Sequence, residues 1–251
     1  MNSLFPDRTA FLASVVSKEE AIVALKAHID VVDVKNPAEG ALGAALPETI
    51  SEIRGVVPKT IPVSAAIGDM PYLPGTAALA AIGAAQAGAS IIKVGLYGAK
   101  TPDEVLKLLF SVSTALKKYC PESSLVVGAY ADAQFFGGID FLAVPSMAAE
   151  AKAAGCLLDT FDKSFGHNLL EIASMERVRD FVSACREWGL FSALAGSLKL
   201  EDIPLLLPLR PDYLGFRGAL CEGGRSGKLS SRKVLEISSL IAGESSTCRR
   251  S

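Results

Sequence analysis

The sequence predicts an α/β protein, a single (β/α)8 TIM barrel, on three observations. The chain has 251 residues, a size typical of such barrels built as one domain. Eight short β-like segments alternate with helix-like segments, and this alternation is typical of a parallel sheet. The mean hydropathy of +0.35 is high, yet no run of about 18 apolar residues exists. This combination favours strands that are buried on both faces.

Short apolar segments mark the expected strands, and segments with good N-caps or an early proline mark the helices. The most clearly expected helices are Lys18–His28, Thr76–Gly88, Pro102–Tyr119 and Met175–Trp188. The strands are expected at Phe11–Val16, Val31–Lys35, Ile61–Asp69, Ile91–Gly98, Leu125–Asp132, Cys156–Lys163, Phe191–Lys199 and Tyr213–Cys221.

One domain is expected, because no linker divides the chain. We assign residues 1–242 to the barrel, which is the catalytic domain if the protein is an enzyme. The segment 243–251 is polar and ends near Arg249 and Arg250, so we expect it to be a disordered C-terminal tail.

Composition argues against several classes of function. The 25 basic and 27 acidic residues give a net charge of −2, and no basic stripe interleaves with aromatic residues. Nucleic-acid binding is therefore not expected. Five cysteines without a CxxC pair and two histidines argue against a structural zinc site. The N-terminus has no basic segment before an apolar core, so we expect no signal peptide, no membrane association and a cytoplasmic protein.

Charged residues lie on expected strands where a barrel should be apolar. In VVDVK, Asp33 and Lys35 share one face and two valines share the other, so we expect both charges to point into the barrel. The same alternation in IIKVG points Lys93 inward. Asp159 and Lys163 are four residues apart and share a face if the strand continues to Lys163. Barrels place such groups at the C-terminal mouth, where active sites are built.

The inward lysines point to Schiff-base chemistry. A lysine that is partly desolvated, or that lies near another cation, has a lowered pKa and becomes a nucleophilic amine. Neighbouring aspartates raise that pKa, so the sequence leaves open which lysine is neutral at pH 7. The alternative is a structural network of aspartates and lysines that closes the barrel mouth.

The loops after the last two expected strands point to a phosphate site. Gly196 and Ser197 lie at the C-terminal end of the seventh expected strand, and Arg217, Gly218 and Ala219 lie at that of the eighth. Barrels often bind phosphate at these two loops through backbone N–H groups. Small residues there let the backbone approach the anion.

Other polar residues are not expected to act in catalysis. His28 is expected near the end of a helix and His167 in a loop, and Cys221 is expected to be a small buried hydrophobe. The segments 33–44 and 67–76 are rich in turn residues, and we expect both to lie over the barrel mouth.

Six segments resemble the (5-formylfuran-3-yl)methyl phosphate synthase family, also called 4-(hydroxymethyl)-2-furancarboxaldehyde-phosphate synthases, of methanofuran biosynthesis. They are DVKNPAEGALGA, SAAIGDMPYLPGT, IIKVGLYG, LLDTFDKS, LAGSL and RGALCEGGR, and they occur in the family's order. The resemblance implies a class I aldolase-like barrel. It also implies that two molecules of glyceraldehyde 3-phosphate, the triose phosphate substrate, condense with loss of one phosphate and two waters. No metal or organic cofactor is implied, and a homo-oligomer is expected because barrels of this kind often associate.

The resemblance also implies a role for each residue. Lys35 in DVKNP would form the Schiff base, Lys93 would accept a proton, and Asp33, Asp159 and Lys163 would assist proton transfers. The substrate phosphate would be held by Gly196, Ser197, Arg217, Gly218 and Ala219. Two other functions stay open: a different Schiff-base aldolase or lyase acting on a sugar phosphate, and a non-catalytic barrel that senses a phosphorylated metabolite.

Overall fold

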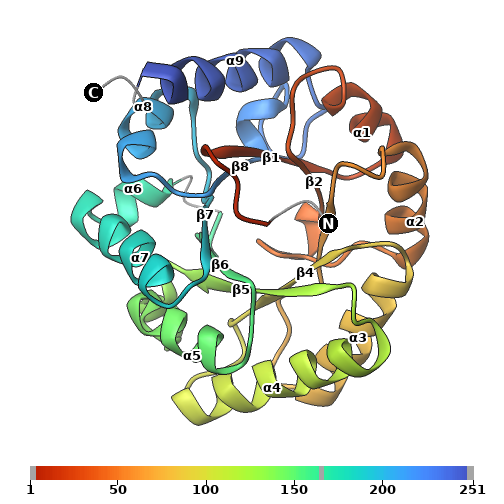
Figure 1. Cartoon of the computed structure of the whole chain (residues 1–251), viewed down its shortest axis with the longest axis vertical. Helices are drawn as coiled ribbons and strands as arrows, with labels where there is room; N and C mark the ends of the chain where they lie inside the picture. Colours follow the sequence, from red (N-terminus) through yellow and green to blue (C-terminus); the bar gives the residue numbers. More distant parts are fainter. Residues whose placement is uncertain (1–3, 164–166, 248–251) are drawn as a thin grey trace.

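In the computed structural model, which describes residues 4–163 and 167–247, eight parallel strands form a closed barrel inside a ring of helices (Figure 1). The predicted fold class is therefore confirmed. The strands are β1 (Ala10–Val15), β2 (Val31–Val34), β3 (Val63–Ala66), β4 (Ile91–Gly95), β5 (Ser124–Tyr130), β6 (Gly155–Asp159), β7 (Phe191–Leu194) and β8 (Tyr213–Phe216). Each strand pairs with its neighbours in chain order, and β8 closes the barrel on β1.

The helices of the outer ring follow the capping signals of the sequence. The helix at Pro102–Tyr119 matches its predicted bounds, because Thr101 and Glu104 form a capping box at its start. The helix predicted to reach His28 ends at Ala24 instead. The α-helices are α1 (Lys18–Ala24), α2 (Pro47–Val56), α3 (Pro74–Gln86), α4 (Pro102–Tyr119), α5 (Val144–Glu150), α6 (Leu169–Ile172), α7 (Met175–Glu187), α8 (Ile203–Leu206) and α9 (Ser231–Thr247).

Most predicted strands run past the observed C-terminal ends. The sequence places the ends of β6 and β7 at Lys163 and Lys199, whereas pairing stops at Asp159 and Leu194. The apolar pattern continues into the loops because these loops cover the barrel mouth and are themselves partly buried. The helix α9 continues to Thr247, beyond the predicted domain end at residue 242, and residues 248–251 of the predicted tail lie outside the described residues.

Two apolar layers fix which side chains face the barrel axis. In β2, Val32 and Val34 pack in the layer between barrel and helices, and Val31 packs in the inner layer. Asp33 has the same inward parity as Val31 and lies one step nearer the mouth. Apolar side chains thus fill the N-terminal part of the barrel interior, and charged ones occupy its C-terminal part.

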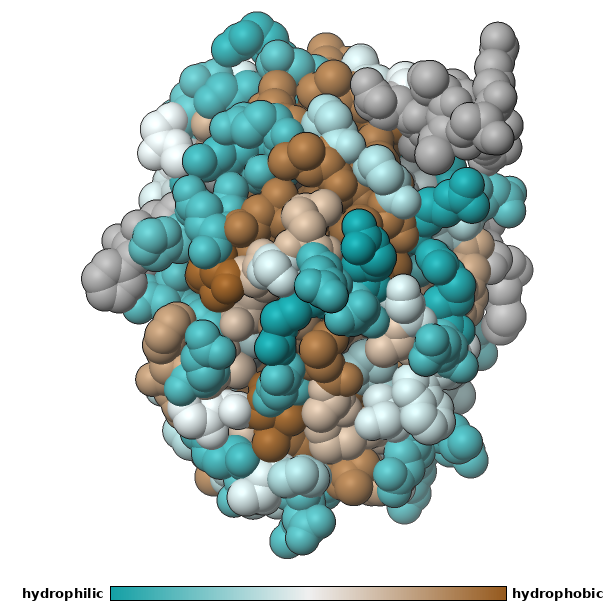
Figure 2. Space-filling model, turned by 90° about the vertical axis from the view of Figure 1, so that its left-hand side faces the viewer, coloured by the Kyte–Doolittle hydropathy of each residue, from teal (hydrophilic) through white to brown (hydrophobic). Residues whose placement is uncertain are grey.

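The outer surface mixes polar and apolar side chains, as Figure 2 shows for one side of the molecule. Within the described ranges, no helix has the length and apolar character that crossing a membrane requires. Cys221 is 1% exposed and packs in the outer apolar layer, as predicted.

Candidate active site

A cavity of about 370 Å³ opens at the C-terminal mouth of the barrel, a size typical of small-molecule sites. Its walls come from the ends of β1, β2, β4, β6, β7 and β8 and from the loops that follow them. The cavity brings together all ten residues that the sequence singled out: Asp33, Lys35, Lys93, Asp159, Lys163, Gly196, Ser197, Arg217, Gly218 and Ala219.

A buried ion pair between Asp33 and Lys93 lies at the floor of this cavity. The Nζ of Lys93 is 2.5 Å from Oδ1 of Asp33. The hydroxyls of Ser64 and Ser14 donate to Oδ1 and Oδ2 of Asp33, at 2.6 and 2.8 Å. Burial raises the pKa of Asp33, but the positive charges of Lys93 and Lys35 outweigh it, so the pKa lies below its usual value. Asp33 is therefore held as a carboxylate.

Lys35 follows β2 directly and is buried, yet its amine forms no ion pair within the described part of the chain. Burial lowers the pKa of Lys35 to about 8. The carboxylates of Asp159 and Asp33 oppose this shift, and the charges of Lys93 and Lys163 add to it. The neutral, nucleophilic form of Lys35 is thus accessible near neutral pH.

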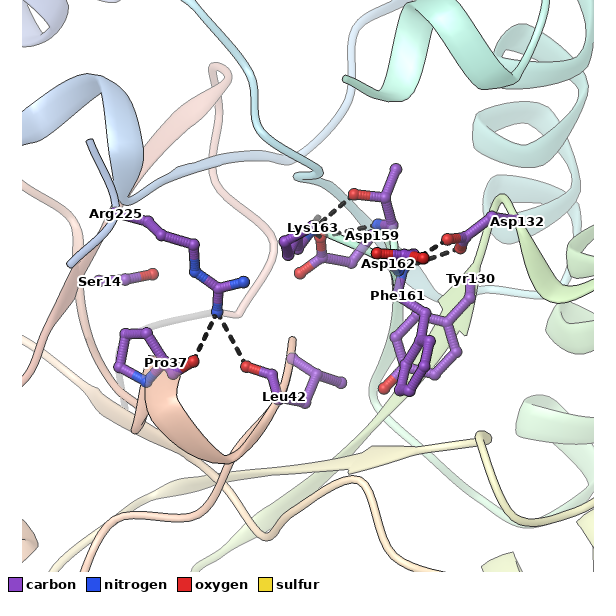
Figure 3. Close-up of polar contacts among 12 residues, drawn as sticks. Ser14, Pro37, Leu42, Tyr130, Asp132, Asp159, Phe161, Asp162, Lys163 and Arg225 are labelled. Carbon is purple, nitrogen blue, oxygen red and sulfur yellow. Dashed lines mark hydrogen bonds and ion pairs between the residues drawn. The ribbon is translucent and has the colours of Figure 1, made fainter. Parts of the chain in front are cut away.

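A second ion pair, Lys163 with Asp159, faces the first across the cavity. The Nζ of Lys163 lies 2.7 Å from Oδ1 of Asp159 and 2.6 Å from Oγ1 of Thr160 (Figure 3). The expectation that β6 continues to Lys163 is wrong, because the strand ends at Asp159. The two side chains meet nevertheless, because the loop after β6 turns back over the carboxylate.

Asp132, which the sequence analysis did not single out, fixes that loop. It lies just after β5 and is buried. Its Oδ1 and Oδ2 accept hydrogen bonds from the backbone N–H groups of Phe161 and Asp162, at 2.7 and 2.8 Å (Figure 3). Asp132 thereby sets the position from which Lys163 reaches Asp159.

Backbone N–H groups line the β7 and β8 side of the cavity. Gly196 and Ser197 have φ of +104° and +54°, and Gly218 and Ala219 begin a short 3-10 helix. The N–H groups of these four residues have no protein acceptor within residues 4–163 and 167–247. An array of this kind, lined by small residues, suits a phosphoryl group.

Arg217 lies in the predicted phosphate loop, but its guanidinium is committed to the protein. Its Nη1 is 2.5 Å from Oε2 of Glu20 and also donates to the carbonyl of Ser14 at 3.3 Å. Its Nη2 donates to Oε1 of Glu20 and to the carbonyl of Gly227, and its Nε to the carbonyl of Arg225. All five N–H donors of the guanidinium are therefore used, and Arg217 can contribute only its backbone to an anion site.

The loop between β2 and α2 closes the β4 and β5 side of the mouth. Leu42 in this loop is fully buried and occupies the space beside Gly128, where a Cβ would collide with Cδ1 of Leu42. Asp69 accepts from the N–H of Leu42 at 2.8 Å and from the hydroxyl of Tyr130. Burial raises the pKa of Asp69, and these hydrogen bonds oppose the shift. The cavity is consequently confined to the half of the mouth that holds the lysines.

Three functional candidates were missed by reasoning from the sequence: Asp69, Asp132 and Arg225. Arg225 lies in the loop after β8 and lines the cavity. A signal for all three existed, since each is a charged residue at the C-terminal end of an expected strand or within a segment that carries the resemblance. His28 and His167 are both exposed and do not line the cavity.

Solved structures with the same architecture include decarboxylase and isomerase barrels. A structure of KGPDC from Streptococcus mutans matches with a TM-score of 0.66 and 12% identity, over 94% of this chain and 98% of that one. Phosphoribosyl anthranilate isomerase from Thermus thermophilus matches with a TM-score of 0.61 and 15% identity, over 94% and 99%. At such identities these likenesses concern the fold alone.

Sequence relatives are much closer. The (5-formylfuran-3-yl)methyl phosphate synthase of Methanosarcina barkeri is 44% identical over 90% of this chain and 96% of its own. The enzymes of that name from Methanopyrus kandleri and Methanocaldococcus jannaschii are 42% and 43% identical, over 94% and 91% of this chain and 100% and 98% of theirs. The family model described as 4-HFC-P synthase matches residues 11–238. The chain therefore belongs to the 4-HFC-P synthase family.

Proposed function

We propose that this chain condenses two molecules of glyceraldehyde 3-phosphate into (5-formylfuran-3-yl)methyl phosphate, as a step of methanofuran biosynthesis, with Lys35 as the Schiff-base residue. The product is the one that the relatives are named for. The observation that carries the proposal is the state of Lys35: a buried amine without an ion pair in the described residues, with a pKa of about 8, in a cavity that also offers N–H groups for phosphate.

The chemistry begins with attack of the neutral Lys35 amine on the aldehyde carbon of one triose phosphate. Loss of water gives an iminium, which withdraws electrons and acidifies the neighbouring C–H bond. The Lys93–Asp33 pair lies in the same cavity, and we assign Lys93 to proton acceptance, for which its ammonium first passes a proton to the Asp33 carboxylate. Asp159 and Lys163 form a second proton-exchanging pair for the later dehydrations.

The atoms balance for this reaction. Two triose phosphates together contain the six carbons of the furan aldehyde and its phosphomethyl group, one released phosphate and two released waters. Carbon is neither oxidised nor reduced overall, so no external redox partner is required. Aromatisation of the ring makes the overall reaction effectively irreversible.

Incubation of the purified protein with glyceraldehyde 3-phosphate alone tests this function. We expect growth of a furan-aldehyde absorption band, with one phosphate released per furan, and a covalent adduct at Lys35 on treatment with borohydride. Reversible cleavage of another sugar phosphate without a furan band would indicate a different Schiff-base aldolase. Tight binding without any covalent adduct would indicate the sensing barrel.

The pH dependence of Schiff-base formation gives a second test. Lys35 has a pKa of about 8, and only its neutral form attacks, so trapping by cyanoborohydride should fall about tenfold for each pH unit below that value and level off above it. Asp159→Asn removes a carboxylate that raises this pKa. The pH at which the trapping rate of this variant begins to fall should therefore be lower than in wild type. A trapping rate that already falls below the ordinary pKa of lysine, or a profile that moves to higher pH in Asp159→Asn, would contradict the assignment.

We also propose that the enzyme acts as a cytoplasmic homo-oligomer. Leu46, Leu79 and Phe135 are 70%, 72% and 78% exposed, but single exposed apolar side chains are normal on monomers, so the proposal rests on the frequent association of barrels of this kind. The four cysteines within the described residues are free and buried, which agrees with a reducing compartment.

A further inference from the structure

The cavity carries more positive charge than the proposed Schiff-base chemistry uses. Six basic side chains line it, against two carboxylates. Lys93, Lys163 and Arg217 each have a carboxylate partner. Of the remaining three, Lys35 is assigned to the Schiff base and Lys199 is exposed. Arg225 is the partly buried cation without an assigned role.

The guanidinium of Arg225 is positioned by neutral groups. Its Nη2 donates to the carbonyls of Gly40 and Pro37, at 2.9 and 3.3 Å (Figure 3). Its Nε and Nη1 have no protein acceptor among the residues that the structure describes, and no carboxylate there pairs with it. Burial lowers the pKa of Arg225, but a guanidinium remains charged at neutral pH. A cation that is held in place with free donors suits an anionic ligand.

Arg217 holds in place the loop after β8 that carries Arg225. The guanidinium of Arg217, anchored on Glu20, donates to the carbonyls of Arg225 and Gly227, at 2.9 and 3.1 Å. These bonds clamp the backbone of the loop after β8. The loop in turn projects the Arg225 side chain toward the loop after β2. These contacts favour a positioned binding group over a mobile surface arginine.

We propose that Arg225 binds the phosphoryl group of the second triose phosphate, at a subsite separate from the N–H groups of Gly196 and Gly218. This inference rests on the proposed function, because that function requires two phosphorylated substrates in one cavity. The N–H groups follow β7 and β8, whereas the Arg225 guanidinium contacts the loop after β2. Arg225 itself starts beside Gly218, since its backbone N would lie 3.8 Å from a Cβ on Gly218, and its side chain extends past β1 to the loop after β2. The second anion site would thus lie toward β2, and the first at β7 and β8.

Titration of inorganic phosphate into the Lys35→Met protein tests the subsite without turnover. We expect two phosphates to bind per chain, and one site to weaken at least about tenfold in Lys35→Met/Arg225→Gln, since charge-assisted bidentate hydrogen bonds are lost. The matched control is Arg232→Gln, which removes an exposed arginine of α9 outside the cavity. Unchanged affinity and stoichiometry in Arg225→Gln would overturn the inference, whether or not the wild-type protein makes a furan.

A second measurement separates recognition of phosphate from support of the β2 loop. In Arg225→Gln with Lys35 intact, Schiff-base trapping of unphosphorylated glyceraldehyde should stay at the wild-type rate, while furan formation from glyceraldehyde 3-phosphate falls. A parallel loss of both reactions would mean that Arg225 only holds the loop, and would also overturn the inference. Arg225→Lys, which keeps the charge but not the fork of donors, should lie between wild type and Arg225→Gln.

Discussion

Replacement of Lys35 by methionine is expected to abolish catalysis and to make the protein more stable. The variant has no amine to form the iminium, so furan formation should fall by at least about 10³-fold, and borohydride should trap no adduct. Methionine retains the buried aliphatic stem. The comparison therefore removes the charge and the nucleophile and leaves most of the packing.

The gain in stability follows from the sign of the pKa shift. The pKa of Lys35 is lowered in the folded protein, from 10.5 to about 8, so at neutral pH the folded state carries an ammonium that the unfolded chain accommodates better. This corresponds to a gain of about 1–3 kcal/mol in the free energy of unfolding of Lys35→Met at pH 7. The gain should shrink as the pH rises from about 8 toward 10.5, where the unfolded chain also loses the proton.

Urea unfolding of wild type and Lys35→Met at several pH values measures this difference. Lys26→Met is the matched control, because Lys26 is exposed in the turn after α1, and it should change the free energy of unfolding little. A Lys35→Met variant that is less stable than wild type at pH 7 would mean that the two aspartates hold Lys35 as a stabilising ammonium. The assignment of Lys35 as the nucleophile would then lose its physical basis.

The alternation of strand residues was sufficient to predict the centre of the site. In β2, the valines mark the helix side, so the inward parity of Asp33 and Lys35 follows from the sequence alone, and Lys93 in β4 is found in the same way. Loops carry no such periodicity. Lys163 was placed beside Asp159 by assuming that β6 continues to Lys163, whereas the strand ends at Asp159 and the contact depends instead on Asp132.

The role of each arginine could not be predicted, because it depends on partners that are distant in the sequence. Arg217 lies in a segment that reads as a phosphate loop, yet Glu20, 197 residues away, takes its guanidinium. Arg225 acquires its position from carbonyls 188 and 185 residues away. Leu42 and Tyr130 both donate hydrogen bonds to Asp69, and no local pattern indicates this contact between the loop after β2, the loop after β3 and strand β5.

Replacement of Lys93 by methionine is expected to have the opposite effect on stability from Lys35→Met. The Lys93 ammonium pairs with Asp33 at 2.5 Å in the buried floor of the cavity. Its removal leaves a carboxylate that, among the described residues, only the hydroxyls of Ser14 and Ser64 hydrogen-bond. Breaking one side of a buried pair typically costs about 3–5 kcal/mol. Furan formation should also be lost if Lys93 is the proton acceptor.

The pH dependence and a double variant separate the structural effect of Lys93 from its chemical one. The pKa of Asp33 lies below its usual value in the wild type because of Lys93 and Lys35, against the effect of burial, so this carboxylate stabilises the fold above its unfolded pKa and the contribution is lost as the pH falls. In Lys93→Met the pKa of Asp33 should rise, and the variant should become relatively more stable toward acid.

Asp33→Asn/Lys93→Met removes both charges and should recover most of the lost stability without recovering activity. If instead Lys93→Met unfolds at the same urea concentration as wild type at every pH, the pair contributes nothing to the fold, and its geometry in this cavity must be ascribed to catalysis alone.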